Sequence, residues 1–152
     1  MDNPKSNIVV GVDLGGTTIK AGLVSADGSI LYNNKFPTYA DKGPATVIQQ
    51  IRAAVQDALK HTDGAQVGGI GIGSPGVVDD EGVVKAPPNF VDWDEVPLKS
   101  ELSKLFPAVS IGVENDANAA AIAESKFGAG VQYPNFLFVI WGTGVGGGII
   151  LN

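Results

Sequence analysis

The first three apolar segments of the chain follow one another through turns that are too short to hold a helix. Ile8 to Asp13 reads as a buried strand, Ile19 to Ala26 as a second and Ser29 to Phe36 as a third, and Asp27-Gly28 is a two-residue sequence favoured in hairpins. These features predict an antiparallel meander. A dinucleotide-binding domain starts instead with strand, helix and parallel strand, so the sequence disfavours that class of fold.

Helix and strand patterns alternate in the rest of the chain. The expected helices are Pro44 to His61, Leu98 to Phe106 and Asp116 to Phe127. The expected strands are Val67 to Gly73, Val77-Val78, Val83-Val84, Val109 to Asn115, Phe136 to Trp141 and, after a glycine loop at Gly142 to Gly148, Ile149 to Leu151. This order predicts an α/β domain with a mixed sheet and flanking helices.

Composition excludes several classes of protein. Glycine accounts for 21 of 152 residues without a collagen-like period, so the excess serves turns and close backbone approaches. The net charge is −6, whereas proteins that bind bulk nucleic acid or anionic membranes are basic. Cysteine is absent, and Met1 to Asn7 lacks the apolar core of a signal peptide. We expect a soluble cytoplasmic domain with no nucleic-acid partner and no membrane association.

Four segments place Gly, Asp, Asn or Thr at the end of an apolar strand, and strand ends gather at one edge of a layered sheet, where ligands bind. The first segment is Asp13-Leu14-Gly15-Gly16-Thr17-Thr18. Its glycines let backbone N–H groups approach a polyanion, its hydroxyls add donors, and Lys20 adds a counter-charge. Asp13 can hold Mg²⁺ through water. A Gly-Gly hairpin turn with a solvated Asp13 is the alternative.

The second segment is Gly142 to Gly148, which matches the pattern G-x-G-x-x-G, as does Gly71 to Gly76. A dinucleotide site needs a helix after the loop, but strand-like residues follow both matches, so neither indicates NAD binding. A phosphate-binding hairpin and a plain glycine turn both stay open for Gly142 to Gly148.

The third segment is Glu114-Asn115-Asp116-Ala117-Asn118, at a strand-to-helix junction. Helix capping is one interpretation. The other makes Asp116 a general base and lets Asn115 orient a polyol substrate.

The fourth segment is Pro87-Pro88-Asn89-Phe90 with Trp93, in which the Asn89 amide can bind hydroxyls. A plain connection packed by its aromatic residues is the alternative.

These motifs occur in one order along the chain: Asp13 to Lys20, Gly73 to Gly76, Pro88-Asn89, Glu114 to Ala120 and Gly142 to Gly148. Together they closely resemble the N-terminal half of the ROK family of bacterial glucokinases, related sugar kinases and sugar-responsive repressors. The resemblance covers Ile8 to Leu151. It implies an actin-like, ribonuclease H-like ATPase fold.

The resemblance also implies roles for individual residues, with ATP and Mg²⁺ as cofactors and a hexose, glucose first, as the substrate. Asp13 would lie near Mg²⁺, and Asp116 would bind the sugar and take the proton from its hydroxyl. The first phosphate loop would be Gly15, Gly16, Thr17 and Thr18 with Lys20 beside it, and the second would be Gly142, Thr143 and Gly144. The sugar would be bound by Asn115 and Asn89, with Gly76 lining its pocket.

ROK kinases continue with a Glu-x-Gly-His sugar-binding motif, a Cys-rich zinc motif and a C-terminal lobe. None of these lies in this sequence, so residues 1–152 are expected to form the N-terminal lobe alone, without the structural zinc site. The face that would meet a second lobe favours self-association, and we expect a homo-oligomer. The implied function is an ATP-dependent sugar kinase. A non-catalytic sugar-sensing or regulatory protein is the alternative, although the presence of Asp13 and Asp116 favours the kinase.

Overall fold

A five-stranded mixed sheet forms the centre of the protein, in the order β3-β2-β1-β4-β8. The computed structural model describes residues 8–141 and 144–152. Strands β1 (Ile8–Leu14), β2 (Thr18–Ser25) and β3 (Ile30–Pro37) pair antiparallel, whereas β4 (Val67–Ser74) and β8 (Ile111–Asn115) run parallel to β1. The antiparallel start and the mixed sheet are therefore confirmed.

The turn between β2 and β3 differs from the expected two-residue hairpin. The Ser25 N–H donates to Ser29 O across 3.0 Å, and the Gly28 N–H donates to Ser25 O across 2.9 Å. Three residues, Ala26 to Gly28, therefore form the loop. Gly28 has a φ of 85°, and the glycine is favoured because it adopts this left-handed conformation without steric strain.

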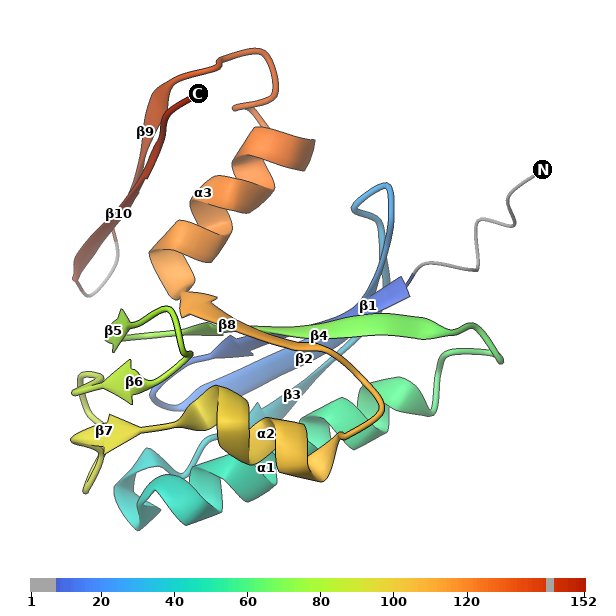
Figure 1. Ribbon diagram of the computed structural model, residues 1–152, viewed down its shortest axis with the longest axis vertical. Helices are drawn as coiled ribbons and strands as arrows, with labels where there is room; N and C mark the ends of the chain where they lie inside the picture. Colours follow the sequence, from blue (N-terminus) through green and yellow to red (C-terminus); the bar gives the residue numbers. More distant parts are fainter. Residues whose placement is uncertain (1–7, 142–143) are drawn as a thin grey trace.

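Two helices, α1 (Pro44–Leu59) and α2 (Leu98–Leu105), cover one face of the sheet (Figure 1). Helix α1 follows a short 3₁₀ turn, η1 (Ala40–Lys42), and ends two residues before the expected His61. Its core face matches the sequence pattern: Val47, Ile51, Ala54, Val55 and Ala58 are buried. They pack with the inward side chains of β1, Ile8, Val10, Val12 and Leu14. Within the described residues, no helix combines the length and the apolar composition needed to cross a membrane.

A small antiparallel sheet lies beside the ends of β4 and β8 and consists of β5 (Val77–Val78), β6 (Val84–Lys85) and β7 (Glu95–Val96). Strand β7 was not expected from the sequence, and Val83 lies before β6 rather than within it. Trp93 is buried, and its indole N–H donates to Val84 O across 3.2 Å. This contact fixes the loop that contains Asn89 against the small sheet.

The other face of the central sheet is partly covered by α3 (Asp116–Phe127), which carries the hairpin β9 (Phe136–Trp141) and β10 (Val145–Ile150) (Figure 1). Strand β10 begins at Val145, so the expected loop at Gly142 to Gly148 is too long by four residues. A Cβ on Gly148 would lie 2.5 Å from Ala121 Cβ. The last glycines of this run therefore allow β10 to pack closely on α3 instead of forming a turn.

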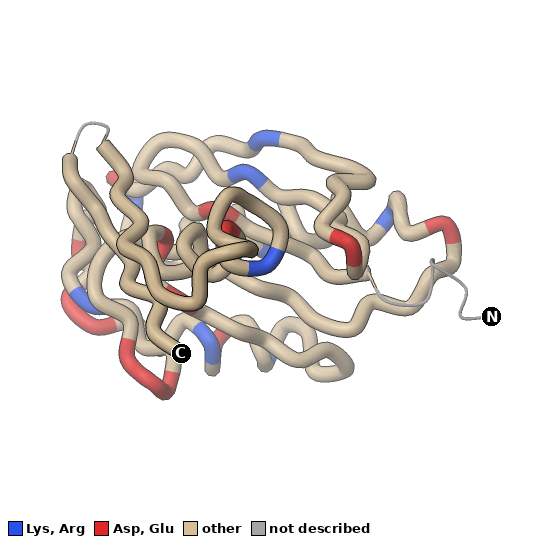
Figure 2. The backbone as a smooth tube through the Cα atoms, turned by 90° about the horizontal axis from the view of Figure 1, so that it is seen from above, with Lys and Arg blue, Asp and Glu red and all other residues tan. Residues whose placement is uncertain are grey.

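The outer face of the β9–β10 hairpin is apolar. The side chains exposed on it are Leu137, Val139, Trp141, Val145 and Ile149. Neither strand contains a charged residue, and Figure 2 shows the hairpin without blue or red along both strands. These side chains therefore form one exposed apolar surface on the hairpin, which is larger than scattered single side chains would form.

Candidate active site

The carboxyl ends of the three parallel strands meet at one edge of the central sheet. Asp13 on β1 lies opposite Gly73 on β4, and Gly73 lies opposite Glu114 on β8. Ser74 lies opposite Asn115 in the next register position. The expectation that the ends of these apolar strands gather at one edge is confirmed.

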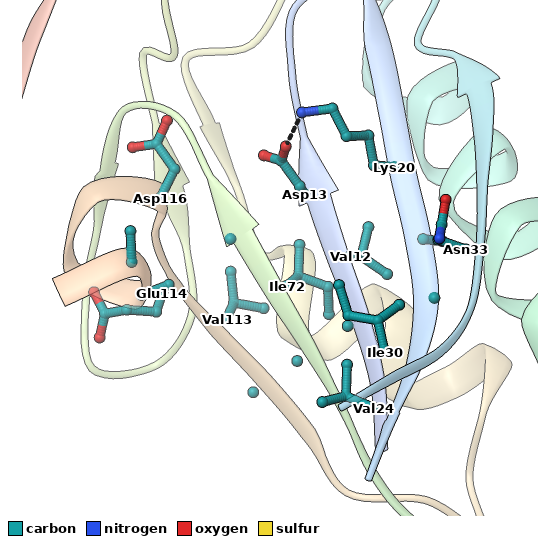
Figure 3. Close-up of a pocket in the computed structure, with 18 of the residues that line it drawn as sticks. Val12, Asp13, Lys20, Val24, Ile30, Asn33, Ile72, Val113, Glu114 and Asp116 are labelled. Carbon is teal, nitrogen blue, oxygen red and sulfur yellow. Dashed lines mark hydrogen bonds and ion pairs between the residues drawn. The ribbon is translucent and has the colours of Figure 1, made fainter. Parts of the chain in front are cut away.

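Asp13 and Asp116 line the same hollow, which has a volume of about 1080 Å³ and also includes Lys20. Figure 3 shows Asp13 and Asp116 on either side of β4, near the ends of the strands. The Lys20 Nζ lies 2.9 Å from Asp13 Oδ2, and both side chains are more than half exposed. Asp13 stays accessible from the hollow despite this ion pair, so another cation can replace the Lys20 ammonium group beside its carboxylate.

The floor of the hollow is a row of glycines. Gly11 on β1 lies opposite Gly22 on β2 and Gly71 on β4, and Gly71 in turn lies opposite Gly112 on β8. All four line the hollow. Because they lack side chains, the middle of this sheet face stays open beside the two carboxylates. The sequence shows that glycine is abundant. It does not show that these four glycines align, because the alignment depends on the register of four strands.

The predicted first phosphate loop joins β1 to β2. The Gly15 N–H donates to Thr18 O across 3.1 Å, and a Cβ on Gly15 would lie 2.8 Å from the same oxygen. Gly15 is therefore required by the tightness of the turn. Gly16 is exposed, and a Cβ there would lie 3.9 Å from Asn89 Cβ. The fold thus brings the predicted phosphate loop next to the predicted sugar-binding Asn89, although neither lines the hollow.

Asn89 lies in an unusually constrained loop. Ala86, Asn89 and Asp92 all have positive φ angles, of 41°, 68° and 56°. Such angles are uncommon for residues other than glycine and persist where the surroundings hold them. Phe90 packs edge-to-face on Trp93, and the Val91 N–H donates to Ala40 O across 3.0 Å. The loop is therefore fixed to the body of the protein, and Asn89 is exposed on it.

Asn115 caps α3, as the capping interpretation expects. Its Oδ1 accepts hydrogen bonds from the N–H groups of Ala117 and Asn118, at 3.0 and 3.2 Å. Its Nδ2 donates to Gly76 O across 2.9 Å. One N–H of the amide therefore faces the β4–β5 turn, and the second N–H is the group left for a ligand.

Asp116 is the first residue of α3, and its side chain is exposed. Its Oδ1 accepts from the Ala117 N–H across 2.8 Å. The positive end of the helix favours a carboxylate at this position. The N-cap is therefore Asn115, and the Asp116 carboxylate lies exposed beside it at the helix start.

Of the predicted second phosphate loop, Gly142 and Thr143 lie outside the described residues. Gly144 is exposed and directly precedes β10. A Cβ on Gly146 would lie 3.3 Å from Ala117 Cβ, so this end of the hairpin is held near the start of α3. Gly144 is therefore near the same helix end as Asp116, although it does not line the hollow.

Sequence reasoning missed several polar groups of this region. Glu114 lines the hollow, and its Oε1 accepts from the Asn115 N–H at 2.8 Å and from Asn118 Nδ2 at 3.1 Å. Asn33 and Lys35 on β3 also line it, with Lys35 opposite Lys20. The alternation of side chains along β3 could have indicated which residues share this face, but only with the strand register known.

The donor set at the sheet edge suits a water-coordinated ion. The described residues contain no group of three or more His, Cys, Asp or Glu side chains placed to hold a metal. Asp13 and Asp116 offer oxygen ligands only, and Mg²⁺ is commonly held by one or two carboxylates with water and phosphate completing its shell. These residues therefore fit Mg²⁺ that arrives with a phosphate ligand.

Comparison with known proteins gives one family. The model of the ROK family matches residues 9–152. A glucokinase of Thermotoga maritima is 43% identical over 145 residues, and one of Streptomyces coelicolor is 40% identical over 146. Each comparison covers 95% of this chain and 44% of the relative, so the chain spans less than half the length of these proteins.

The solved structures give the same result. A ROK family glucokinase from Streptomyces griseus, in complex with glucose and AMPPNP, matches with a TM-score of 0.84 and 41% identity. That match covers 95% of this chain and 44% of the other. ROK sugar kinases have the actin-like ATPase fold, so the expected fold class is confirmed.

Proposed function

The chain belongs to the ROK family, and from this premise we propose that it is the N-terminal lobe of a sugar kinase that transfers the γ-phosphoryl group of ATP to a hexose hydroxyl. Glucose is the first candidate substrate, because the Streptomyces griseus relative binds glucose and an ATP analogue. The boundaries of the lobe are proposed as residues 1–152. The remaining walls of the cleft would come from a second lobe.

The observation that carries this proposal is the common hollow lined by Asp13 and Asp116. Phosphoryl transfer needs a base near the acceptor hydroxyl and a group that holds the metal-bound phosphates. Two accessible carboxylates, Asp13 at the end of β1 and Asp116 at the start of α3, would supply these two roles at one site. A regulatory protein that only senses sugar needs neither a base nor a metal-binding carboxylate, so the alternative is less well supported.

In this proposal Asp116 accepts the proton of the sugar hydroxyl as that oxygen attacks phosphorus. Asn89 and the second N–H of Asn115 bind other hydroxyls of the sugar. Gly76 lines the sugar pocket, and because it has no side chain, the backbone of that wall can lie close to the sugar. The constrained loop around Asn89 supports this role, because a fixed ligand group orients its substrate with little loss of entropy.

The phosphates of ATP would lie against the backbone of Gly15 to Thr18, with Lys20 as a counter-charge and the loop Gly142 to Gly144 on the other side. Asp13 would hold Mg²⁺ through water, and the ion when bound neutralises charge on the phosphates. The exposed Gly16 beside Asn89 supports this arrangement, since donor and acceptor sites must adjoin for transfer. A homo-oligomeric state and a location in the cytoplasm stay predictions.

The complete gene product is the material for the test. Purified protein is assayed for ADP release with MgATP and, separately, glucose, mannose, fructose and N-acetylglucosamine, and sugar binding is measured in parallel by calorimetry. Hexose-dependent ADP release is the expected result. Tight sugar binding without ADP release would contradict the kinase and favour the regulatory protein.

A further inference from the structure

We propose that Thr38 is a positioning residue that holds the predicted first phosphate loop in its ligand-binding conformation. This inference rests on the proposed function, because the loop is assigned to ATP there. Thr38 lies immediately after β3, and its side chain is completely buried. Among the residues that the structure describes, only Thr38 and Ser74 are buried polar residues.

Thr38 holds the loop through two hydrogen bonds. Its hydroxyl donates to Gly15 O across 2.6 Å, and its backbone N–H donates to Thr17 O across 3.0 Å. The Thr18 carbonyl accepts from the Gly15 N–H within the loop. Three of the loop's four carbonyl groups are therefore engaged by donors of the protein. A carbonyl oriented in this way cannot turn toward a bound phosphate, which it would repel.

The bond to Gly15 O also fixes the direction of the next N–H group. Gly15 C=O and Gly16 N–H belong to one planar trans peptide unit, in which they point in opposite directions. Because the oxygen points to the buried Thr38 hydroxyl, the Gly16 N–H points away from it. No hydrogen bond joins the Gly16 N–H to another described residue. Gly16 is exposed, so its N–H is accessible to an anion from solvent, and Asn89 lies near the same residue.

Thr38→Val tests this role, because valine has nearly the shape of threonine but cannot donate to Gly15 O. Thr38→Ser retains the hydroxyl and is the conservative variant. Thr46→Val is the matched control: the Thr46 hydroxyl also donates to a backbone carbonyl, that of Lys42 at 3.1 Å, but in the first turn of α1. If Thr38→Val fails to fold, Thr38→Ala removes the same hydroxyl without a new methyl group.

The first measurement is amide hydrogen exchange without nucleotide, which does not depend on enzymatic activity. In Thr38→Val, exchange of the Gly15 and Thr38 amides, which donate to Thr18 O and Thr17 O, is expected to become at least about 10-fold faster relative to the core amides of β1, with Thr38→Ser close to the unsubstituted protein. Unchanged exchange in the loop, or the same change in Thr46→Val, would overturn the proposal.

The second measurement is steady-state kinetics of the complete gene product. Thr38→Val is expected to raise the KM for MgATP about 10-fold, with kcat and the KM for sugar changed less than about 2-fold, and Thr38→Ser to restore the affinity. A purely structural residue would lower thermal stability and leave the KM for MgATP unchanged, and that result would overturn the proposal. If the unsubstituted protein has no kinase activity, the proposed function fails, and loop exchange alone decides the role of Thr38.

Discussion

The side-chain amide of Asn115 donates a hydrogen bond to the backbone carbonyl of Gly76 across 2.9 Å, and this bond joins the start of α3 to the turn between β4 and β5. The two residues are 39 positions apart. Gly76 has a φ of 89°, and a Cβ there would lie 2.7 Å from Lys85 O. One amide thus connects the capped helix that carries Asp116 with the glycine turn and, through it, with the loop of Asn89.

Replacing Asn115 separates its two structural roles. Asn115→Ala removes both the cap and the bond to Gly76, and we expect a loss of about 1–2 kcal/mol in the free energy of unfolding. Asn115→Asp retains an oxygen for the helix N–H groups but replaces the donor to Gly76 O by a second acceptor oxygen; we expect a smaller loss of stability, because the cap is kept and the helix start favours a carboxylate. Urea denaturation measures both variants. Equal losses would show that the bond to Gly76, and not the cap, dominates.

Asp116→Asn tests the proposed general base. The amide oxygen can still accept from the Ala117 N–H, which lies 2.8 Å from Asp116 Oδ1, so the fold should be preserved. We expect kcat of the complete gene product to fall about 10²–10⁴-fold while sugar binding is partly retained. Asp80→Asn, at an exposed carboxylate of the β5–β6 connection, is the control. Near-normal turnover in Asp116→Asn would leave this residue with a helix-end role only.

Gly15 and Gly16 should differ in what they tolerate. A Cβ on Gly15 would lie 2.8 Å from Thr18 O, so Gly15→Ala is expected to destabilise the protein by about 1–3 kcal/mol. A Cβ on Gly16 has an ordinary contact of 3.9 Å, so Gly16→Ala should change stability by less than about 0.5 kcal/mol. Its methyl group would nevertheless hinder phosphate approach. Thermal unfolding and calorimetric titration with MgATP measure these effects, and normal nucleotide affinity in Gly16→Ala would remove Gly16 from the phosphate site.

Gly148→Ala should weaken the attachment of the β9–β10 hairpin to α3. The added Cβ would lie 2.5 Å from Ala121 Cβ and 3.1 Å from Ala117 O, which forces the hairpin outward. We expect a loss of about 1–3 kcal/mol in stability. Gly112→Ala is the matched control, because Gly112 is also a strand glycine but has no atom within 4 Å of the added Cβ. Equal stability of the two variants would contradict close packing at Gly148.

A pH dependence is expected from Tyr32 and Asp57. The Tyr32 hydroxyl, 2.6 Å from Asp57 Oδ2, is the main cause that holds the pKa of Asp57 below its usual value of 3.8, and the Asn34 amide adds to it. Since the folded-state pKa is depressed, the stabilisation is complete above the unfolded-state value and is lost as the pH falls through the folded-state value. The same bond raises the pKa of Tyr32 above 10.0, so it also weakens as the pH rises beyond that value.

Tyr32→Phe measures this contribution. Urea denaturation across the pH range should give a stability difference from the unsubstituted protein that is constant near neutral pH. The difference should shrink below about pH 4 and above about pH 10. Phenylalanine keeps the ring that stacks on His61, so a difference that does not change in acid would show that the hydroxyl does not act through its bond to the Asp57 carboxylate.

Local patterns in the sequence predicted most elements of the fold. Helix α3 was predicted with its observed bounds, because Asn115 is a strong cap, Gly128 a strong stop, and the alanines between them favour helix. Strand β9 was also predicted with its bounds, and the buried face of α1 follows the spacing of its apolar residues. These features depend on interactions among residues close in the chain, which is why periodicity and capping reveal them.

The position of the candidate site at one edge of the sheet was predicted for the same reason. Asp13, Asn115 and Asp116 were proposed as candidates because they lie at the ends of apolar strands, and parallel strands end at one edge of a sheet. The sequence does not show which atoms of these residues make structural hydrogen bonds. The structure shows that Asn115 Oδ1 caps α3 and that one N–H of its amide donates to Gly76 O, and its role as a sugar ligand through the second N–H stays a prediction.

Only the tertiary structure distinguished the functions of the glycines and found Thr38. Gly142 to Gly148 reads as one loop, yet Gly148 pairs with Phe138 in the β9–β10 hairpin, and it must be glycine because Ala121 of α3 approaches it closely. Thr38 follows a strand in an unremarkable sequence, and it matters because β3 returns alongside β2 and places its hydroxyl at Gly15. Both results depend on contacts between residues that are far apart in the chain, and a local sequence pattern carries no information on the energies of such contacts. The strands and helices themselves were determined by the sequence, because they depend on residues close in the chain.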